Sequence, residues 1–253
     1  MIPFLKKEIL EQFRRKRVLL LGILFAAFAL LGVATAKLTP VIMEMFADDL
    51  AASGMVYEIT DSTIMDAWMQ FFKNAAIPLI VVIILWGGAF TGEYQKHTLI
   101  PLVTKGLSRT GIFAAKMITA ALVWTAGFAL YFAIFYGYAE FYWGNASVKH
   151  IALAVSMYWL YGLWLLAILG LFSSFAGTTM QVLLGVGGVF FVVSFLEFIP
   201  KLPDKLPTAL TGGLSLLQGK SVPADFTFPI LLVIVCIVLC LAGGVLLIQK
   251  KEV

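Results

Sequence analysis

The sequence predicts an all-α, polytopic membrane protein with six transmembrane helices. Of its 253 residues, 61% are hydrophobic and only 13% are charged, whereas an ordinary soluble domain carries roughly 25% charged residues. The mean hydropathy is +0.98, and the apolar residues are concentrated in long runs. So few ionic side chains cannot cover a water-facing surface, which excludes a soluble enzyme, a disordered chain and a nucleic-acid-binding protein. We expect a single transmembrane domain, residues 1–253.

Long uncharged runs locate the spans. A helix needs about 20 mostly apolar residues to cross the hydrocarbon, and the sequence holds five uncharged runs: Val18–Ala36, Ala75–Gly92, Met117–Ala139, Ile151–Leu196 and Phe226–Gln249. The fourth run is about twice as long as one span requires, and the small polar residues of Ser173–Gln181 indicate where it reverses direction. We therefore expect six spans, at about residues 18–36, 75–92, 117–139, 151–172, 180–197 and 226–249.

The orientation follows from Lys and Arg, because cytoplasmic loops carry an excess of them. Placing both termini in the cytoplasm puts 12 of the 18 Lys and Arg residues on the inner side and 10 of the 14 acidic residues on the outer side. We therefore expect a multi-pass protein of the plasma (cytoplasmic) membrane with both termini cytoplasmic. Ala34-Thr35-Ala36 resembles a signal-peptide cleavage site, but the preceding apolar run is long for a signal peptide, so we interpret it as a retained span.

Residues 2–16 predict an amphipathic helix that lies at the membrane interface. Ile2, Leu5, Ile9 and Phe13 recur at spacings of three and four, so they share one helix face, and charged residues fall on the opposite face. Such a helix lies in the headgroup plane of the lipid, with its Lys and Arg side chains near anionic headgroups. A simple topology anchor is the alternative, and the two interpretations are compatible.

The outer side carries a long acidic segment and an aromatic one. Lys37–Asn74 predicts two short helices, Met43–Ala52 and Thr63–Phe72, that cap the outer side. We favour a solvated segment over an acidic vestibule for cations, because the sorting of charge across the membrane explains the acidity. Tyr131–Trp143 predicts an aromatic belt at the outer interface; a stacking surface for a hydrophobic substrate is the alternative.

Proline concentrates between the fifth and sixth spans. Four of the nine prolines fall in Leu196–Asp225, on both sides of the apolar stretch Thr208–Leu217. That stretch is too short to cross a bilayer, so we expect an outer re-entrant segment whose backbone is satisfied by protein or water. Glu197, at the outer end of the fifth span, is the carboxylate on that side best placed for a function.

The sequence shows no convincing catalytic, cofactor-binding or metal site. Leu214–Ser221 resembles a phosphate-binding P-loop, but Leu214 stands where the loop needs its first glycine. Ser215 and His150 do not indicate a serine protease, because no GxSxG motif surrounds the serine. No HExxH motif occurs, and we expect the two cysteines, four residues apart, to pack as small hydrophobic side chains.

The only substantial inner loop is Thr91–Lys116, between the second and third spans. A polar start is followed by an apolar patch around Pro101 and then by basic residues. From composition alone, a short amphipathic helix that docks a soluble partner and a solvated turn are equally compatible with this pattern.

The order of residues in this loop resembles the signature of ABC-2 type permeases, the membrane subunits of ATP-binding-cassette exporters. Their pattern is an acidic residue that ends span two, a basic residue, a Gly-Thr-Leu-like step, an apolar stretch, Ser-Arg, and a Lys that opens span three. The matching residues here are Glu93, Lys96, Thr98-Leu99, Leu102-Val103, Ser108-Arg109 and Lys116, with His97 in place of the usual glycine. The N-terminal helix and the proline-rich segment also resemble the family, and Gln70–Asn74 is similar to bacterial members.

The resemblance implies a permease subunit that is not itself an enzyme. Two such subunits, identical or paired with a sister permease, would sit on two separate ATPase subunits, where ATP and Mg bind. Residues 93–109 would form the cytoplasmic coupling segment. Its expected docking contacts are Leu99, Leu102 and Val103, beside Thr98, and its expected orienting charges are Glu93, Lys96 and Arg109.

The chief alternative is a channel or an ion-coupled carrier that works without an ATPase. Carriers normally place ionisable groups near the middle of the membrane, and the uncharged runs contain none. The sequence does not identify the transported substrate. The expected partners are the ATPase, a second permease and membrane lipid, with no nucleic acid and no cofactor on this chain.

Overall fold

The computed structural model describes residues 2–47, 61–95 and 108–250, and the regular secondary structure of these residues is entirely helical. Six helices are long and apolar enough to cross a membrane, which confirms the predicted fold class. A further helix, α1, precedes them, and four short elements lie between α8 and α10. The bounds of the long helices are α1 Ile2–Arg14, α2 Arg17–Met45, α4 Ile64–Gln95, α6 Arg109–Tyr142, α7 Ile151–Phe175, α8 Thr179–Leu196 and α10 Thr227–Lys250.

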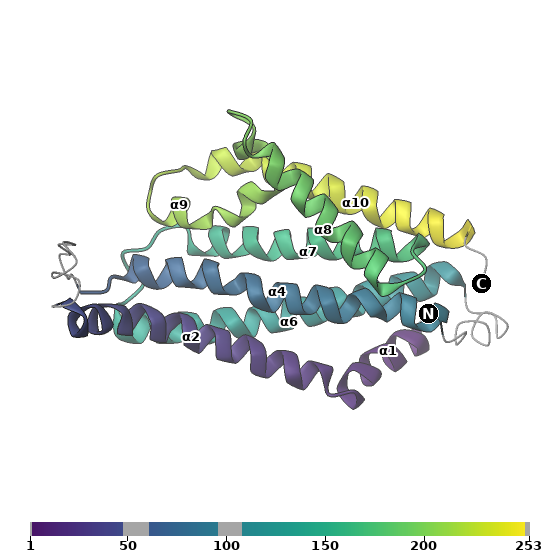
Figure 1. Ribbon diagram of the computed structural model, residues 1–253, viewed down its shortest axis with the longest axis horizontal. Coiled ribbons are helices and arrows are strands. Elements are labelled where there is room, and N and C mark those ends of the chain that lie inside the picture. The colour runs from purple at the N-terminus through teal and green to yellow at the C-terminus, as the bar shows by residue number, and fades with distance from the viewer. Residues whose placement is uncertain (1, 48–60, 96–107, 251–253) are drawn as a thin grey trace.

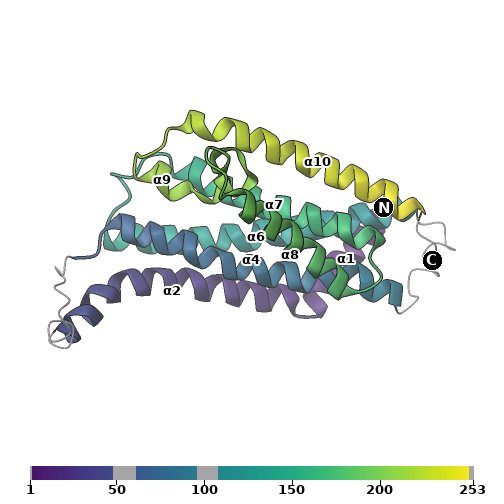
Figure 2. The ribbon, with the colours of Figure 1, turned by 45° about the horizontal axis from the view of Figure 1, so that its top comes forward.

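The spanning helices alternate in direction, so both chain ends lie at one end of the bundle (Figure 1). We call this the N/C end; it also holds the end of α4, the start of α6 and the turn between α7 and α8. The opposite, far end holds the segment between α8 and α10. Helix α2 packs along α4 and α6, and α10 packs along α7 on the outside of the bundle (Figure 2).

Helix α4 begins earlier than the hydropathy predicts. The prediction of a separate short helix at Thr63–Phe72 is wrong. Its residues from Ile64 onward are helical, but they form the first turns of α4, which continues through Lys73 into the span. Asp66 accepts hydrogen bonds from the backbone N–H and the hydroxyl of Thr63, which fixes the helix start. Lys73 is exposed and interrupts the hydropathy without interrupting the helix. The other expected helix, Met43–Ala52, lies partly outside the described residues.

Aromatic side chains fill the middle of the bundle. The ring centroid of Phe71 lies 4.8 Å from that of Tyr131 and 5.0 Å from that of Phe135, and Tyr131 donates a 2.7 Å hydrogen bond to the carbonyl oxygen of Phe71. Tyr131 and Phe135 are therefore core residues rather than members of the predicted belt. Farther along α6, Phe141 and Tyr142 are exposed, because the helical period turns them away from the other helices.

Close contact between α6 and α7 depends on a glycine. A Cβ atom on Gly162 would lie 2.3 Å from the indole of Trp124, so only a residue without a side chain leaves room for that ring. The indole N–H of Trp124, on α6, donates a 3.0 Å hydrogen bond to the carbonyl oxygen of Trp159, which lies on α7 with Gly162. This interlock fixes the two helices against each other in the core.

The proline-rich segment folds into short helical turns over the far end of α7 and α10. Leu210, Leu216 and Leu217 are buried there, so the apolar stretch of this segment packs against protein. The elements are η1 Pro203–Lys205, η2 Pro207–Thr211, α9 Gly213–Leu217 and η3 Pro223–Phe226.

Candidate functional site

The predicted coupling residues fall at the N/C end, on both sides of residues 96–107. Glu93 belongs to the last turn of α4 and Arg109 is the first residue of α6. The remaining predicted residues lie outside the described part of the chain: Lys96, Thr98, Leu99, Leu102 and Val103. The structure therefore defines the two helices to which the predicted segment is attached.

Helix α6 starts with a defined cap and is tied to the end of α10. The Ser108 hydroxyl accepts a 3.1 Å hydrogen bond from the N–H of Gly111, which satisfies one of the free donors at the helix start. Arg109 donates from Nη1 to the carbonyl oxygen of Gln249 at 3.3 Å. In return, Nε2 of Gln249 donates to the Thr110 hydroxyl at 3.2 Å.

A small apolar cluster, separate from the aromatic core, joins three helices at this end. It consists of Phe90 of α4, Phe113 and Met117 of α6, and Ile248 of α10. The rings of Phe90 and Phe113 lie 5.7 Å apart, and a Cβ atom on Gly244 of α10 would lie 2.6 Å from the Phe113 ring. We call this group the end cluster; it packs the two helices that flank residues 96–107 against each other and against α10.

A buried ion pair attaches α1 to the same place. Nζ of Lys116 lies 3.2 Å from a carboxylate oxygen of Glu8, and each residue is only 3% exposed. The same Nζ lies 5.7 Å from the centre of the Phe90 ring, a favourable position for a cation. Removing either charge alone would take away the closest opposite charge of a buried group, which is costly in a low-dielectric interior. The pair therefore holds α1 against α6 beside the end cluster.

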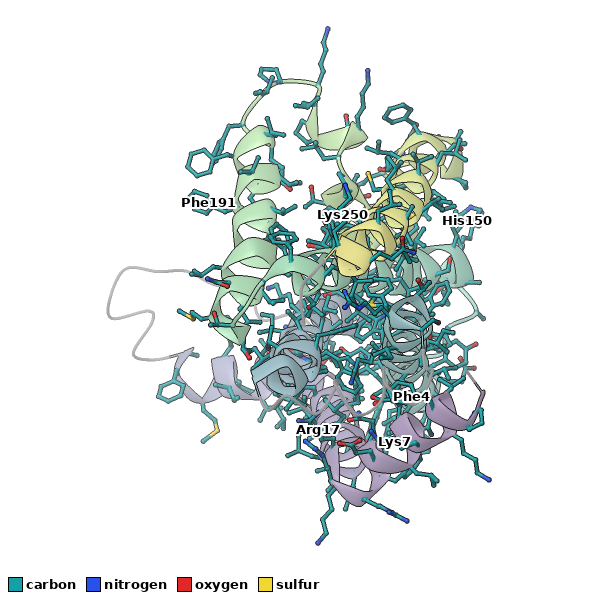
Figure 3. All side chains as sticks on the ribbon, turned by 90° about the vertical axis from the view of Figure 1, so that its right-hand side faces the viewer. Phe4, Lys7, Arg17, His150, Phe191 and Lys250 are labelled. Carbon is teal, nitrogen blue, oxygen red and sulfur yellow. The ribbon has the colours of Figure 1, made fainter. Side chains whose placement is uncertain are left out.

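The face of α1 that packs against the bundle is not the apolar face predicted from its sequence. Phe4, Glu8 and Gln12, spaced four residues apart, are buried and form one stripe; Figure 3 shows α1 at the edge of the bundle with Phe4 and Lys7 labelled. Of the predicted interfacial face, Leu5 and Ile9 are half-buried and Phe13 is 61% exposed, while Ile2 begins the helix. Glu8 and Gln12 were missed because polar residues do not register in a hydrophobic period. The available signal was their spacing from Phe4.

The turn between α7 and α8 joins the network through two threonines. The hydroxyls of Thr91 on α4 and Thr179 on α8 lie 2.8 Å apart. Thr178 caps α8 by accepting from the N–H of Gln181, whose side chain accepts from the N–H of Thr178. The reversal predicted within Ser173–Gln181 is found between Phe175 and Thr179. Through Thr91, the start of α8 is attached to the last turns of α4.

An apolar groove of about 340 Å³ runs between α4, α7 and α8. Its lining includes Leu79 and Ile83 of α4, Tyr158 and Tyr161 of α7, and Leu183 of α8. Viewed from the N/C end, α8 stands to one side of the bundle with Phe191 turned outward (Figure 3). One wall of the groove is therefore a largely exposed helix, of which only Val182 and Val186 are buried.

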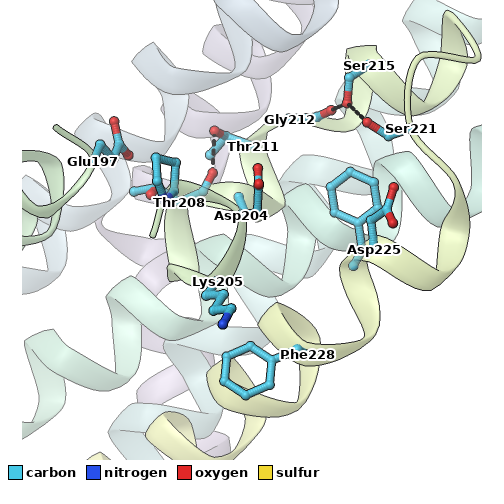
Figure 4. A pocket seen from close by; sticks show the side chains of 13 residues that line it. Glu197, Asp204, Lys205, Thr208, Thr211, Gly212, Ser215, Ser221, Asp225 and Phe228 are labelled. Carbon is cyan, nitrogen blue, oxygen red and sulfur yellow. Dashed lines mark hydrogen bonds between the residues drawn. The ribbon is translucent and has the colours of Figure 1, made fainter. Parts of the chain in front are cut away.

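Another cavity, of about 700 Å³, lies at the far end between the end of α8, the short elements and the start of α10; Figure 4 shows the side chains that line it. Glu197, Asp204 and Asp225 line it together with Lys205 and several hydroxyls. The Ser215 hydroxyl donates to the carbonyl oxygen of Gly212 at 2.8 Å, and no histidine is among the described residues that line the cavity. Ser215 thus lacks the neighbouring base that a nucleophilic serine needs.

Comparison with known families gives one match over most of the chain. The family model described as "ABC-2 family transporter protein" matches residues 2–211. The matched range holds α1, both flanks of residues 96–107, the ion pair and the groove, and it ends before α10. No curated protein matches the chain.

Proposed function

The chain belongs to the ABC-2 family of transporter proteins and is a multi-pass membrane protein, and from this premise we propose that it is the permease subunit of an ATP-driven ABC exporter. One observation carries the proposal. The helices on both sides of residues 96–107 are joined at the N/C end to each other, to α1 and to α10. A partner that pushes on this segment would therefore displace several helices at once.

The distribution of buried charge supports an external power source. Among the described residues, the buried charged side chains are Glu8 and Lys116, which pair with each other at the N/C end. An ion-coupled carrier needs ionisable groups near the middle of the membrane. No Asp, Glu, Lys, Arg or His is buried there in the described spans, which disfavours the carrier and favours a permease driven by a separate ATPase.

In this mechanism the N/C end faces the cytoplasm and rests on the ATPase. Leu99, Leu102 and Val103 would provide apolar docking contacts beside Thr98. Glu93, Lys96 and Arg109 would fix their orientation. ATP and Mg would bind on two ATPase copies, and a second permease, identical or related, would complete the transporter. ATP binding and hydrolysis would then bias the pair between inward-open and outward-open arrangements.

The groove between α4, α7 and α8 is the surface that such a motion would change. Helix α4 carries one flank of the coupling segment, and Thr91 near its end is bonded to Thr179 at the start of α8. A displacement of α4 would therefore alter the width of the groove. We propose that this apolar groove borders the transport path, which suits a substrate with a hydrophobic part.

A double substitution tests the docking surface. Leu99→Asp with Leu102→Asp places two charges in the apolar patch, and we expect the ATPase subunit that accompanies the unmodified chain to be lost on co-purification, together with its stimulated ATP hydrolysis. Val222→Asp is the matched control, because Val222 is an exposed apolar residue at the far end. Unchanged co-purification and hydrolysis in the double variant would refute the docking site. ATP hydrolysis by the purified permease alone would refute the proposal that a separate subunit hydrolyses ATP.

A further inference from the structure

The junction of α1 and α2 combines unpaired cations with an apolar pocket. Arg14, Arg15, Lys16 and Arg17 are consecutive, and of these only Arg15 has an ion-pair partner within the described part of the chain, namely Glu11. Lys16 adopts a left-handed conformation, with φ of 55°, and its side chain does not cap α2. Three cations thus stand next to the N-terminus of α2 in the chain: Arg14 ends α1, Lys16 precedes α2 and Arg17 begins it. The dipole of α2 itself already favours an anion at this point.

A narrow pocket of about 260 Å³ begins beside this junction. Its walls come from Ile9, Gln12 and Phe13 of α1, from the first turns of α2, and from one face of α6 between Thr119 and Leu130. The α6 face covers 11 residue steps, or about 16 Å at about 1.5 Å per residue. That depth is close to half of a hydrocarbon core of about 30 Å, which is one leaflet.

The pocket is partly open at the surface of the bundle and has unfilled space inside it. Leu122 on its rim is 51% exposed, and a Cβ atom on Gly22 would meet nothing within 4 Å. The polar residues in the lining are Gln12 and Thr119, and the Thr119 hydroxyl bonds to its own helix. Gln12 is only 4% exposed, and its Oε1 atom has no hydrogen-bond partner among the described residues.

We propose that this junction binds one anionic phospholipid from the leaflet at the N/C end. The phosphate would lie against Arg14, Lys16 and Arg17, and one acyl chain would enter the pocket along α6. The volume is below the about 300–1,000 Å³ of pockets for drug-sized ligands, so it suits a single chain rather than a compact molecule. Basic residues at a membrane surface favour anionic lipid, and the pocket adds recognition that a surface charge alone does not give. The site is independent of whether an ATPase drives the protein.

Native mass spectrometry of the detergent-purified chain tests the proposal, with phosphatidylglycerol and phosphatidylcholine as probes. We expect the unmodified chain to retain one phosphatidylglycerol under activation that removes phosphatidylcholine. Gly22→Leu fills the pocket and should lower that retention about tenfold, a factor that corresponds to about 1.4 kcal/mol. Gly137→Leu is the matched control, because its Cβ atom also meets nothing within 4 Å and it lies nearer the other end of α6.

A charge series separates the pocket from simple surface attraction. Arg14→Gln, Lys16→Gln and Arg17→Gln together should abolish the preference for phosphatidylglycerol, whereas Lys201→Gln, Lys205→Gln and Lys220→Gln at the far end should preserve it. Ala126→Leu fills the pocket from α6 and replaces Gly22→Leu if that variant does not fold.

Four results would overturn the proposal. Unchanged retention in both pocket-filled variants would reduce the effect to surface charge. An unchanged lipid preference in the triple variant at residues 14, 16 and 17 would exclude the basic junction. Displacement of the lipid by excess inorganic phosphate would indicate a site for free phosphate. Loss of oligomers with lipid retention unchanged in Gly22→Leu would assign the pocket to a second copy of the chain.

Discussion

The middle of the bundle and its N/C end are built by different means. In the middle, large aromatic side chains interlock around Phe71, and Trp124 fits against the bare backbone of Gly162. At the N/C end, four apolar residues form a separate small cluster, and directional contacts supplement it: the pair of Glu8 with Lys116 and the hydroxyl contact of Thr91 with Thr179.

The difference indicates which region can change shape. A close-packed interior tolerates few arrangements, because any displacement opens voids or forces overlaps. An ion pair or a hydroxyl contact ties two helices at one point and leaves the rest of their surfaces free to slide. We infer that the middle maintains the relative positions of α4, α6 and α7, and that the N/C end passes displacement among α1, α4, α6 and α8.

The largest expected effect is on the middle. Trp124→Ala removes a fully buried ring and its hydrogen bond to Trp159, and large-to-small core substitutions of this kind cost about 3–5 kcal/mol. We expect a marked fall in the thermal unfolding temperature in detergent, with transport lost in proportion to the folded fraction. Phe141→Ala removes an exposed ring and should change the unfolding temperature little. Equal effects of the two variants would contradict the conclusion that close packing stabilises the middle of the bundle.

The intermediate effect is on the ion pair. Lys116→Met removes the cation 3.2 Å from the Glu8 carboxylate and leaves the more distant, half-exposed Lys7 at 3.9 Å, and hydrogen bonds to charged groups contribute about 1.5–3 kcal/mol. We expect a smaller fall in unfolding temperature than for Trp124→Ala but a larger loss of ATPase stimulation for each degree lost. The measurement is stimulated ATP hydrolysis plotted against unfolding temperature for both variants.

Reversing the pair provides the control. Glu8→Lys combined with Lys116→Glu restores opposite charges, so it should recover more stimulation than either single change. If the reversed pair recovers stability without recovering stimulation, the pair holds the fold together and does not relay motion.

The sequence predicted six membrane-spanning helices correctly because hydropathy sums over a local window. The five apolar runs are recognised without knowledge of neighbouring helices, and the reversal between Phe175 and Thr179, which divides the fourth run into two spans, is indicated by its own small polar residues. The start of α4 was missed because Lys73 and Asn74 lower local hydropathy while the helix continues. The burial of Tyr131 was missed because a belt tyrosine and a core tyrosine have the same local sequence signal.

The candidate site was less predictable because its contacts join distant segments. Glu8 and Lys116 are 108 positions apart, and the sequence around either residue does not indicate that the other is its partner. The order of residues in 93–109, through its resemblance to a family, led to the prediction of a coupling segment there. It did not indicate that α1 and α10 would each pack against the helices that flank this segment, since that depends on how the helices pack in three dimensions.

The smallest expected effect is on the contact between α4 and α8. Thr179→Val keeps the shape of the side chain but removes the hydroxyl that faces Thr91, and one neutral hydrogen bond contributes about 1 kcal/mol. We expect a small fall in unfolding temperature, and a change in transport at constant ATPase stimulation, because the groove wall is affected and the docking surface is not. Thr39→Val is the matched control, since Thr39 bonds only within its own helix. If Thr179→Val and Thr39→Val behave alike, packing alone links α4 to α8, and the groove does not depend on this hydroxyl contact.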